Sequence, residues 1–109
     1  MSYTGVLATE RPARESPAGI FEWDESKRCS NLRKHGLDFA DCGAVFARPV
    51  ATWVDNRYDY GERRFVTLGL LGARVVAIAH TVSGECVRVI SFRRANKREQ
   101  AKYFQAIPN

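Results

Sequence analysis

The second half of the chain alternates runs of β-branched and aromatic residues with short polar turns. The turns contain Gly61, Gly72 and Gly84, and glycine readily adopts the backbone conformations that tight turns require. Strands joined by such turns pair as antiparallel neighbours. The sequence therefore predicts four consecutive antiparallel strands, which read VATWVD, RRFVTLGLL, RVVAIAHTV and CVRVISFRR.

The first half contains signals for one strand and two helices. Residues 20–23, IFEW, have the aromatic and β-branched character of a short strand. Asp24 can cap the N-terminus of a helix that ends at Gly36, since glycine tolerates the left-handed conformation after a last helical turn. Asp38 can cap a second helix, whose apolar residues recur at helical spacing and which Pro49 brings to an end.

A last helix is predicted from Asn96, with Glu99 in the capping-box position. The expected order is β-α-α-β-β-β-β-α, which is an α+β domain whose helices pack on one face of an antiparallel sheet. A chain of 109 residues suits one hydrophobic core, so we expect a single domain over residues 19–109. Residues 1–18 lack periodicity and are expected to form a disordered N-terminal extension.

Composition narrows the class of partner. The net charge of +5 favours an anionic partner, either nucleic acid or an acidic protein. No apolar run approaches the roughly 20 residues of a membrane helix, and the N-terminus does not look like a secretory signal, so we expect a cytoplasmic protein that contacts no membrane. Cys29, Cys42 and Cys86 lie far apart without a CxxC pair, which predicts free thiols and no metal site.

Three segments of the chain resemble one known family in their order and spacing. They lie within residues 20–104 and are FEWDESKRCSNLRKHGLDFADCGAVF, GERRFVTLG and VRVISFRRANKREQAKYF. The chain resembles the BrnT family, ribonuclease toxins of bacterial type II toxin–antitoxin pairs. The resemblance implies a RelE-like fold and an endoribonuclease that needs no metal ion or cofactor. It also implies a protein antitoxin, encoded by an adjacent gene, through which the complex contacts operator DNA.

Cleavage of RNA without a metal requires a base for the 2′-hydroxyl, cations for the phosphate and an acid for the leaving oxygen. His35 ends a predicted helix, whose dipole favours the imidazolium, so it is a candidate acid or base. The alternative is that His35 only bonds the last helical carbonyls. Glu62 and Arg63 open a predicted strand, as candidate base and phosphate ligand, and the alternative there is a hairpin-end ion pair.

The strand that ends the predicted sheet supplies the strongest candidate. Ile90 and Phe92 are expected in the core, which places Arg93 on the open face. Arg93 is also the arginine of the family's I-S-x-R element, and a guanidinium can bind two phosphate oxygens at once. We expect Glu99 to cap its helix before it serves catalysis. The predicted catalytic set is His35, Glu62, Arg63 and Arg93, and the predicted RNA contacts are Lys34, Arg94, Lys97 and Arg98.

Two other classes of function remain open at this stage. A basic domain can act as a DNA-binding co-repressor without enzyme activity, although the second predicted helix carries acidic residues where a recognition helix would be basic. A toxin of the same fold can instead poison a protein target such as gyrase. A degenerate, inactive toxin is a further alternative.

Overall fold

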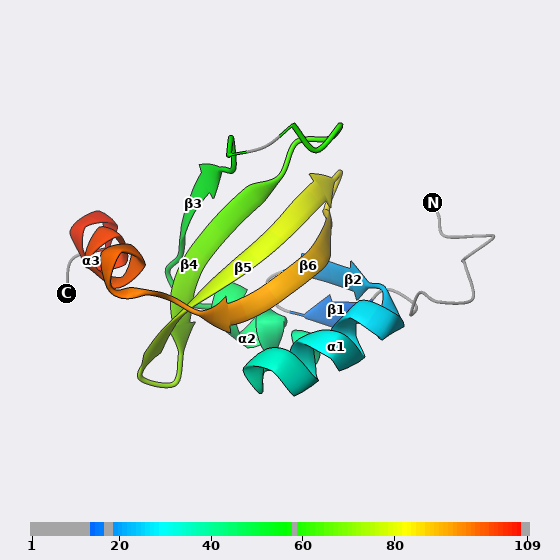
Figure 1. Ribbon diagram of the computed structural model, residues 1–109, viewed down its shortest axis with the longest axis horizontal. Helices are drawn as coiled ribbons and strands as arrows, with labels where there is room; N and C mark the ends of the chain where they lie inside the picture. Colours follow the sequence, from blue (N-terminus) through cyan, green and yellow to red (C-terminus); the bar gives the residue numbers. More distant parts are fainter. Residues whose placement is uncertain (1–13, 17–18, 58, 108–109) are drawn as a thin grey trace.

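The computed structural model describes residues 14–16, 19–57 and 59–107. The chain forms one mixed sheet with helices on both sides (Figure 1). The fold is α+β, as predicted. In chain order the elements are β1 (Arg14–Ser16), β2 (Gly19–Trp23), α1 (Glu25–His35), the 3₁₀ turn η1 (Phe39–Asp41), α2 (Cys42–Phe46), β3 (Ala51–Val54), β4 (Phe65–Leu71), β5 (Arg74–Ser83), β6 (Cys86–Arg94) and α3 (Lys97–Ala106).

The six strands lie in the order β1-β2-β6-β5-β4-β3. Strands β3 to β6 are antiparallel neighbours, as the glycine turns predict. The prediction of a wholly antiparallel sheet is wrong at one place, because β2 pairs with β6 in parallel, from Ile20 opposite Cys86 to Trp23 opposite Val89. This pairing joins segments far apart in the chain, so no turn residues in the sequence indicate it. The RelE-like arrangement implied by the resemblance stays a prediction.

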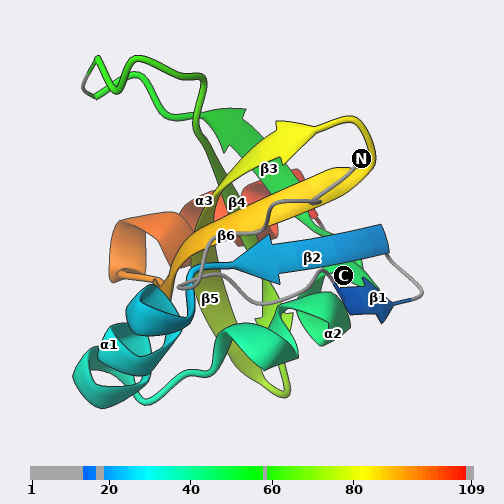
Figure 2. The same cartoon turned by 90° about the vertical axis from the view of Figure 1, so that its right-hand side faces the viewer.

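The helices cover both faces of the sheet, so the prediction that they share one face is also wrong. Helices α1 and α2 lie on one side and α3 on the other (Figures 1 and 2). The first core contains Phe39 and Val45 beneath the sheet residues Val76 and Ile78. Tyr103 of α3 belongs to a second core across the sheet. β5 can serve both cores because its successive side chains point to opposite faces.

A β-bulge in β6 changes which side chains share a face. Ser91 pairs with Ala79, and Val89 pairs with the residue that follows Ala79. Ile90 is therefore an extra residue on β6, which is half-buried and pairs with no residue of β5.

This bulge overturns the predicted alternation along the last strand. Val89 and Phe92 are three residues apart, yet both are buried in the first core. Ile90 does not join them. Beyond the bulge Arg93 lies opposite Ala77, whose side chain belongs to the second core, so Arg93 faces α3 rather than an open sheet surface.

Local helix signals are confirmed. The Asp24 carboxylate accepts from the first backbone N–H groups of α1, and Gly36 ends that helix with φ of 71°. Asn96 and Glu99 form the predicted capping box of α3. The second helix differs, because it starts as the 3₁₀ turn η1. There the Asp38 carboxylate accepts from the N–H of Ala40 and from Arg28, instead of completing a capping box.

The extension predicted for residues 1–18 lies only partly within the residues that the structure describes. Residues 14–16 form β1, a strand that the sequence did not predict. Residues 1–13 and 17–18 lie outside the described residues, so the division at residue 18 stays a prediction. No helix in the described part of the chain is both long enough and apolar enough to cross a membrane.

One buried histidine ties the sheet to the first core. His80 on β5 is 2% exposed, and its Nε2 lies 2.7 Å from Oγ1 of Thr67 on β4. The rings of Phe46 and Phe65 pack against the imidazole. Burial lowers the pKa of His80 from 6.5 to about 4, so the folded protein holds a neutral imidazole there near neutral pH.

Acidification is expected to destabilise the fold through His80. The unfolded chain protonates this residue near pH 6.5 and the folded chain only near pH 4, so unfolding takes up a proton between these values. Stability present above pH 6.5 should fall by up to about 3 kcal/mol as the pH approaches 4. Urea unfolding over a pH series measures this, with His80→Gln as the control that cannot titrate. Parallel curves for the two proteins would contradict the expectation.

Candidate functional site

The end of β6 is held in place by one buried amide on α1. Nδ2 of Asn31 donates to the backbone carbonyl of Phe92 at 2.8 Å, and the Phe92 N–H donates to Oδ1 of Asn31 at 3.1 Å. Asn31 also donates to the carbonyl of Leu37. Strand β2 pairs with β6 only as far as Val89, so Asn31 takes the place of a neighbouring strand at Phe92. This contact sets α1 directly beside the strand that carries Arg93.

Arg93 projects from the end of β6 onto Glu99 of α3. The two side chains form a bidentate ion pair, with Nη1 to Oε1 at 2.8 Å and Nη2 to Oε2 at 2.9 Å. The pair lowers the pKa of Glu99 and raises the pKa of Arg93. Oε1 of Glu99 also accepts from the N–H of Asn96. The capping box thus fixes the carboxylate that orients the guanidinium.

A second arginine approaches the same place from the loop after β3. Arg57 binds the carboxylate of Asp55 at 2.9 and 3.0 Å and is 66% exposed, whereas the Asp55 side chain is 4% exposed. Hydrogen bonds from Arg57, and another from Tyr60, lower the pKa of Asp55 to about 2. The positive charge of Arg57 helps to lower the pKa of Glu99. Two guanidinium groups, each held by its own carboxylate, therefore stand close together.

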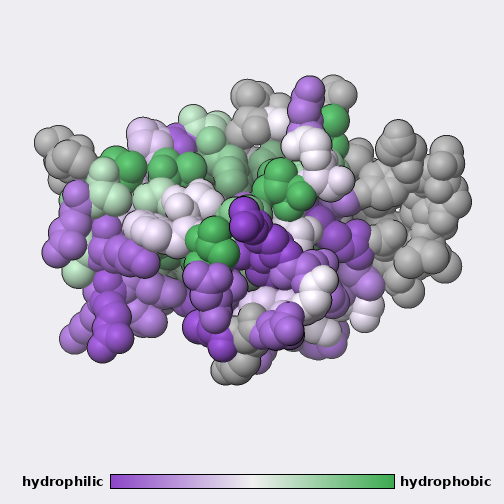
Figure 3. All heavy atoms as spheres, turned by 90° about the horizontal axis from the view of Figure 1, so that it is seen from above, coloured by the Kyte–Doolittle hydropathy of each residue, from purple (hydrophilic) through white to green (hydrophobic). Residues whose placement is uncertain are grey.

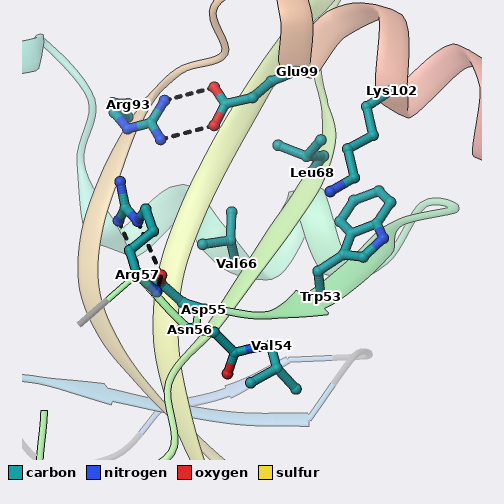
Figure 4. Close-up of a pocket in the computed structure, with 10 residues that line it drawn as sticks. All are labelled: Trp53, Val54, Asp55, Asn56, Arg57, Val66, Leu68, Arg93, Glu99 and Lys102. Atoms are coloured by element: carbon teal, nitrogen blue, oxygen red, sulfur yellow. Dashed lines mark hydrogen bonds and ion pairs between the residues drawn. The ribbon is translucent and has the colours of Figure 1, made fainter. Parts of the chain in front are cut away.

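These residues border a cavity of about 200 Å³ between α3, β4 and the loop after β3. Figure 4 shows Val66 and Leu68 in its middle, with the two arginines on one side and Trp53 on the other. Nζ of Lys102 lies 3.9 Å from the centre of the Trp53 ring, at cation–π distance. The cavity therefore combines an apolar floor, an aromatic wall and a cationic rim.

A groove of about 320 Å³ lies on the other side of β6, between this strand and α1. Lys34 and His35 line it, together with Ser91 of β6. The pKa of His35 is lowered by burial first, and then by the charges of Lys34 and Arg93. Burial and these cations favour the neutral ring, and their effect on the pKa opposes the one predicted for the helix dipole. Because the charge of Arg93 contributes to the lowered pKa of His35, the two candidate residues lie near the same end of β6.

The other predicted residues lie away from both cavities. Glu62 and Arg63 do not open a strand, because β4 begins at Phe65, and both are exposed in the preceding loop. There Oε2 of Glu62 lies 3.2 Å from Nε of Arg64. Arg94 borders a separate hollow beside Phe104. Lys97 and Arg98 are exposed in the first turn of α3. Figure 3 shows both hydrophilic and hydrophobic residues at the end of the molecule where α3 lies.

Sequence reasoning missed three residues that the structure brings to this site. Trp53 and Arg57 lie in the stretch TWVDNR, where an aromatic residue, an acid and a base follow one another closely. That pattern is a usable signal, but it does not indicate that the stretch meets β6. Nothing in the sequence indicated a structural role for Asn31, because a polar residue on a helix with a largely charged surface is expected to be exposed to solvent. No three His, Cys, Asp or Glu side chains in the described ranges gather as a group that could hold a metal ion.

The comparison with protein families defines the class of this protein. The family model for ribonuclease toxins of type II toxin–antitoxin systems matches residues 23–99, more than half of the chain. The chain therefore belongs to the BrnT family. The matched residues include α1, the sheet from β3 to β6 and the start of α3 as far as Glu99. No curated protein matches the chain.

Removing the Asn31 amide is expected to loosen the end of β6. Asn31→Ala leaves the buried N–H and C=O of Phe92 without this partner, so the free energy of unfolding should fall by about 1–3 kcal/mol. Hydrogen exchange should show faster exchange of the Phe92 amide, because its acceptor is gone. Ser30→Ala, an exposed neighbour on the same helix, is the matched control. Unchanged protection of the Phe92 amide would contradict this account of the strand end.

Proposed function

We propose that the protein is an endoribonuclease toxin that cleaves RNA at the end of β6 without a metal ion. The observation that carries the proposal is the position of Arg93 at the end of β6, where it borders one cavity together with Arg57. His35 lines the groove between β6 and α1, and its pKa is lowered by burial and by the charges of Lys34 and Arg93. A phosphodiester that lies across β6 meets guanidinium groups and an imidazole together. These are the groups that metal-free phosphodiester cleavage requires.

In the proposed reaction the neutral imidazole of His35 removes the proton from a ribose 2′-hydroxyl. The 2′-oxygen then forms a bond to phosphorus, the bond to the 5′-oxygen breaks, and the leaving oxygen takes a proton from solvent. Arg93 and Arg57 stabilise the negative charge that builds on the phosphate oxygens. The carboxylate of Glu99 occupies the fork of Arg93 in the free protein. An incoming phosphate has to replace at least one of these two hydrogen bonds.

The remaining predicted residues, apart from Glu62, are assigned to RNA contact in this proposal. Arg63 lies in the same loop as Arg57 and is a phosphate ligand, and Glu62 is the alternative base. Each exposed cation that contacts a phosphate adds affinity that decreases with salt. The proposed backbone contacts are Lys34, Arg94, Lys97 and Arg98.

We also propose that the protein acts in the cytoplasm and is neutralised by an antitoxin from an adjacent gene. The family membership and the net charge of +5 support a partner that is acidic at its contact surface. Operator DNA is proposed to be contacted only through the resulting complex.

Loss of Arg93 should abolish most RNA cleavage. Arg93→Ala removes the phosphate fork, so we expect a rate lower by about 10²–10³-fold, the effect of deleting one transition-state donor. Purified protein is incubated with RNA in EDTA, and cleavage of the wild type should persist. Arg74→Ala, which removes an equal charge at an exposed site at the start of β5, should leave the rate unchanged.

Two outcomes of this assay would contradict the proposal. The first is equal cleavage by the wild type and by Arg93→Ala, which would indicate a contaminating nuclease. The second is the absence of wild-type cleavage together with harmless expression in cells.

In the same assay His35→Gln should slow cleavage without weakening RNA binding, because the proposed role of His35 is proton transfer.

The antitoxin proposal predicts a stable complex. When the chain is co-expressed with the product of the adjacent small gene, the two should co-elute in size-exclusion chromatography and RNA cleavage should stop. Charge complementarity predicts that high salt slows the association of the separated chains. Separate elution at micromolar concentration would refute the partner.

A further inference from the structure

The cavity beside Arg93 has an aromatic wall that the proposed cleavage chemistry does not use. Trp53 extends from β3, and its register opposite Val66 places the indole on the α3 side of the sheet. Its ring is half-buried among the residues of the second core. In Figure 4 the space over Val66 and Leu68 opens between this ring and Arg93.

We propose that this cavity binds one unpaired nucleobase of the RNA, stacked against Trp53, while the adjoining phosphate contacts Arg93 and Arg57. The inference rests on the proposed ribonuclease function and names its substrate class as single-stranded RNA. Aromatic side chains beside a cationic track are how proteins hold single-stranded nucleic acid, because every base has a face that can stack.

The size of the cavity matches this occupant. Its volume of about 200 Å³ is below the roughly 300–1,000 Å³ of clefts that enclose drug-sized ligands, and it suits a single planar base. A base that leaves water and covers the apolar floor of Val66 and Leu68 gains free energy, because apolar surface on both is removed from water. Asn56 also lines the cavity, and its amide can donate to and accept from a base edge.

Lys102 lies over the indole ring of Trp53 in the free protein and can be displaced by a base. Its ammonium group lies over the indole at 3.9 Å, and the residue is exposed on α3. A flexible lysine can move aside for a base and then contact the phosphate next to it. The cation–π contact is weak at such an exposed site, so its loss opposes base binding only slightly.

A base that is still paired in a duplex cannot enter the cavity. Its faces are covered by neighbouring bases, and flipping it out costs a few kcal/mol. The pocket therefore favours loops and unpaired strands.

Tryptophan fluorescence tests the proposal directly, because the chain has two tryptophans and Trp23 is 1% exposed. The probe is a short 2′-O-methyl RNA strand, which lacks the nucleophilic hydroxyl and cannot be cleaved. Binding should quench the fluorescence of the wild type. Trp53→Phe should still bind the strand but lose the quench, since only the buried Trp23 remains.

The affinity of variants gives the second readout. Trp53→Leu keeps an apolar side chain but removes the stacking face, so the dissociation constant for the strand should rise about 5- to 150-fold, the loss of one stacked base. Phe104→Leu removes an exposed aromatic on the other side of α3 and should change nothing. Thermal melting confirms that both variants are folded. A strand with abasic sites should bind the wild type as weakly as it binds Trp53→Leu.

Each outcome decides the proposal separately from the ribonuclease function. Quenching and Trp53-dependent affinity support the base site even if the protein cleaves no RNA. Cleavage of RNA without quenching, or with full affinity in Trp53→Leu, would overturn the base site while the ribonuclease function stands. If Trp53→Leu loses the antitoxin but keeps the oligonucleotide, the cavity is a protein-binding site and the proposal is wrong.

Discussion

The contact between Asn31 and Phe92 determines how the two halves of the molecule meet. Strand β2 ends its pairing with β6 at Val89, and without a replacement the backbone beyond that point would be an open edge. The Asn31 amide supplies both a donor and an acceptor to Phe92, as a strand would. Because Asn31 lies one turn before His35, the same contact brings the end of α1 to the strand that carries Arg93.

The bulge at Ile90 then decides on which side of the sheet Arg93 lies. The first core takes both Val89 and Phe92, which a regular strand would present to opposite faces. One extra residue resolves this conflict and turns Arg93 toward α3, where the capping box has already fixed Glu99. A packing requirement in the core thus sets the geometry of a charged site on the surface.

Much of the local structure could be predicted, because its causes lie within a few residues of each other. The caps at Asp24 and Gly36 satisfy helix-end groups only a few residues away. Arg93 was predicted as a candidate and borders the cavity, whereas Glu62 and Arg63 were assigned to a strand that in fact begins later. Other errors concern contacts across the sheet, such as the parallel partner of β2, the face covered by α3 and the predicted openness of the face on which Arg93 lies.

The sequence by itself determined the α+β class, the helix ends, the antiparallel run from β3 to β6 and the family. These depend on turn residues, capping groups and motif order, which are local or directly readable. Only the tertiary structure decided that Trp53 and Arg57, distant in sequence from Arg93, share a cavity with it. The physical reason is that this cavity arises from strand order and from a bulge, and both are fixed by burial of the two cores, which no short stretch of the chain encodes.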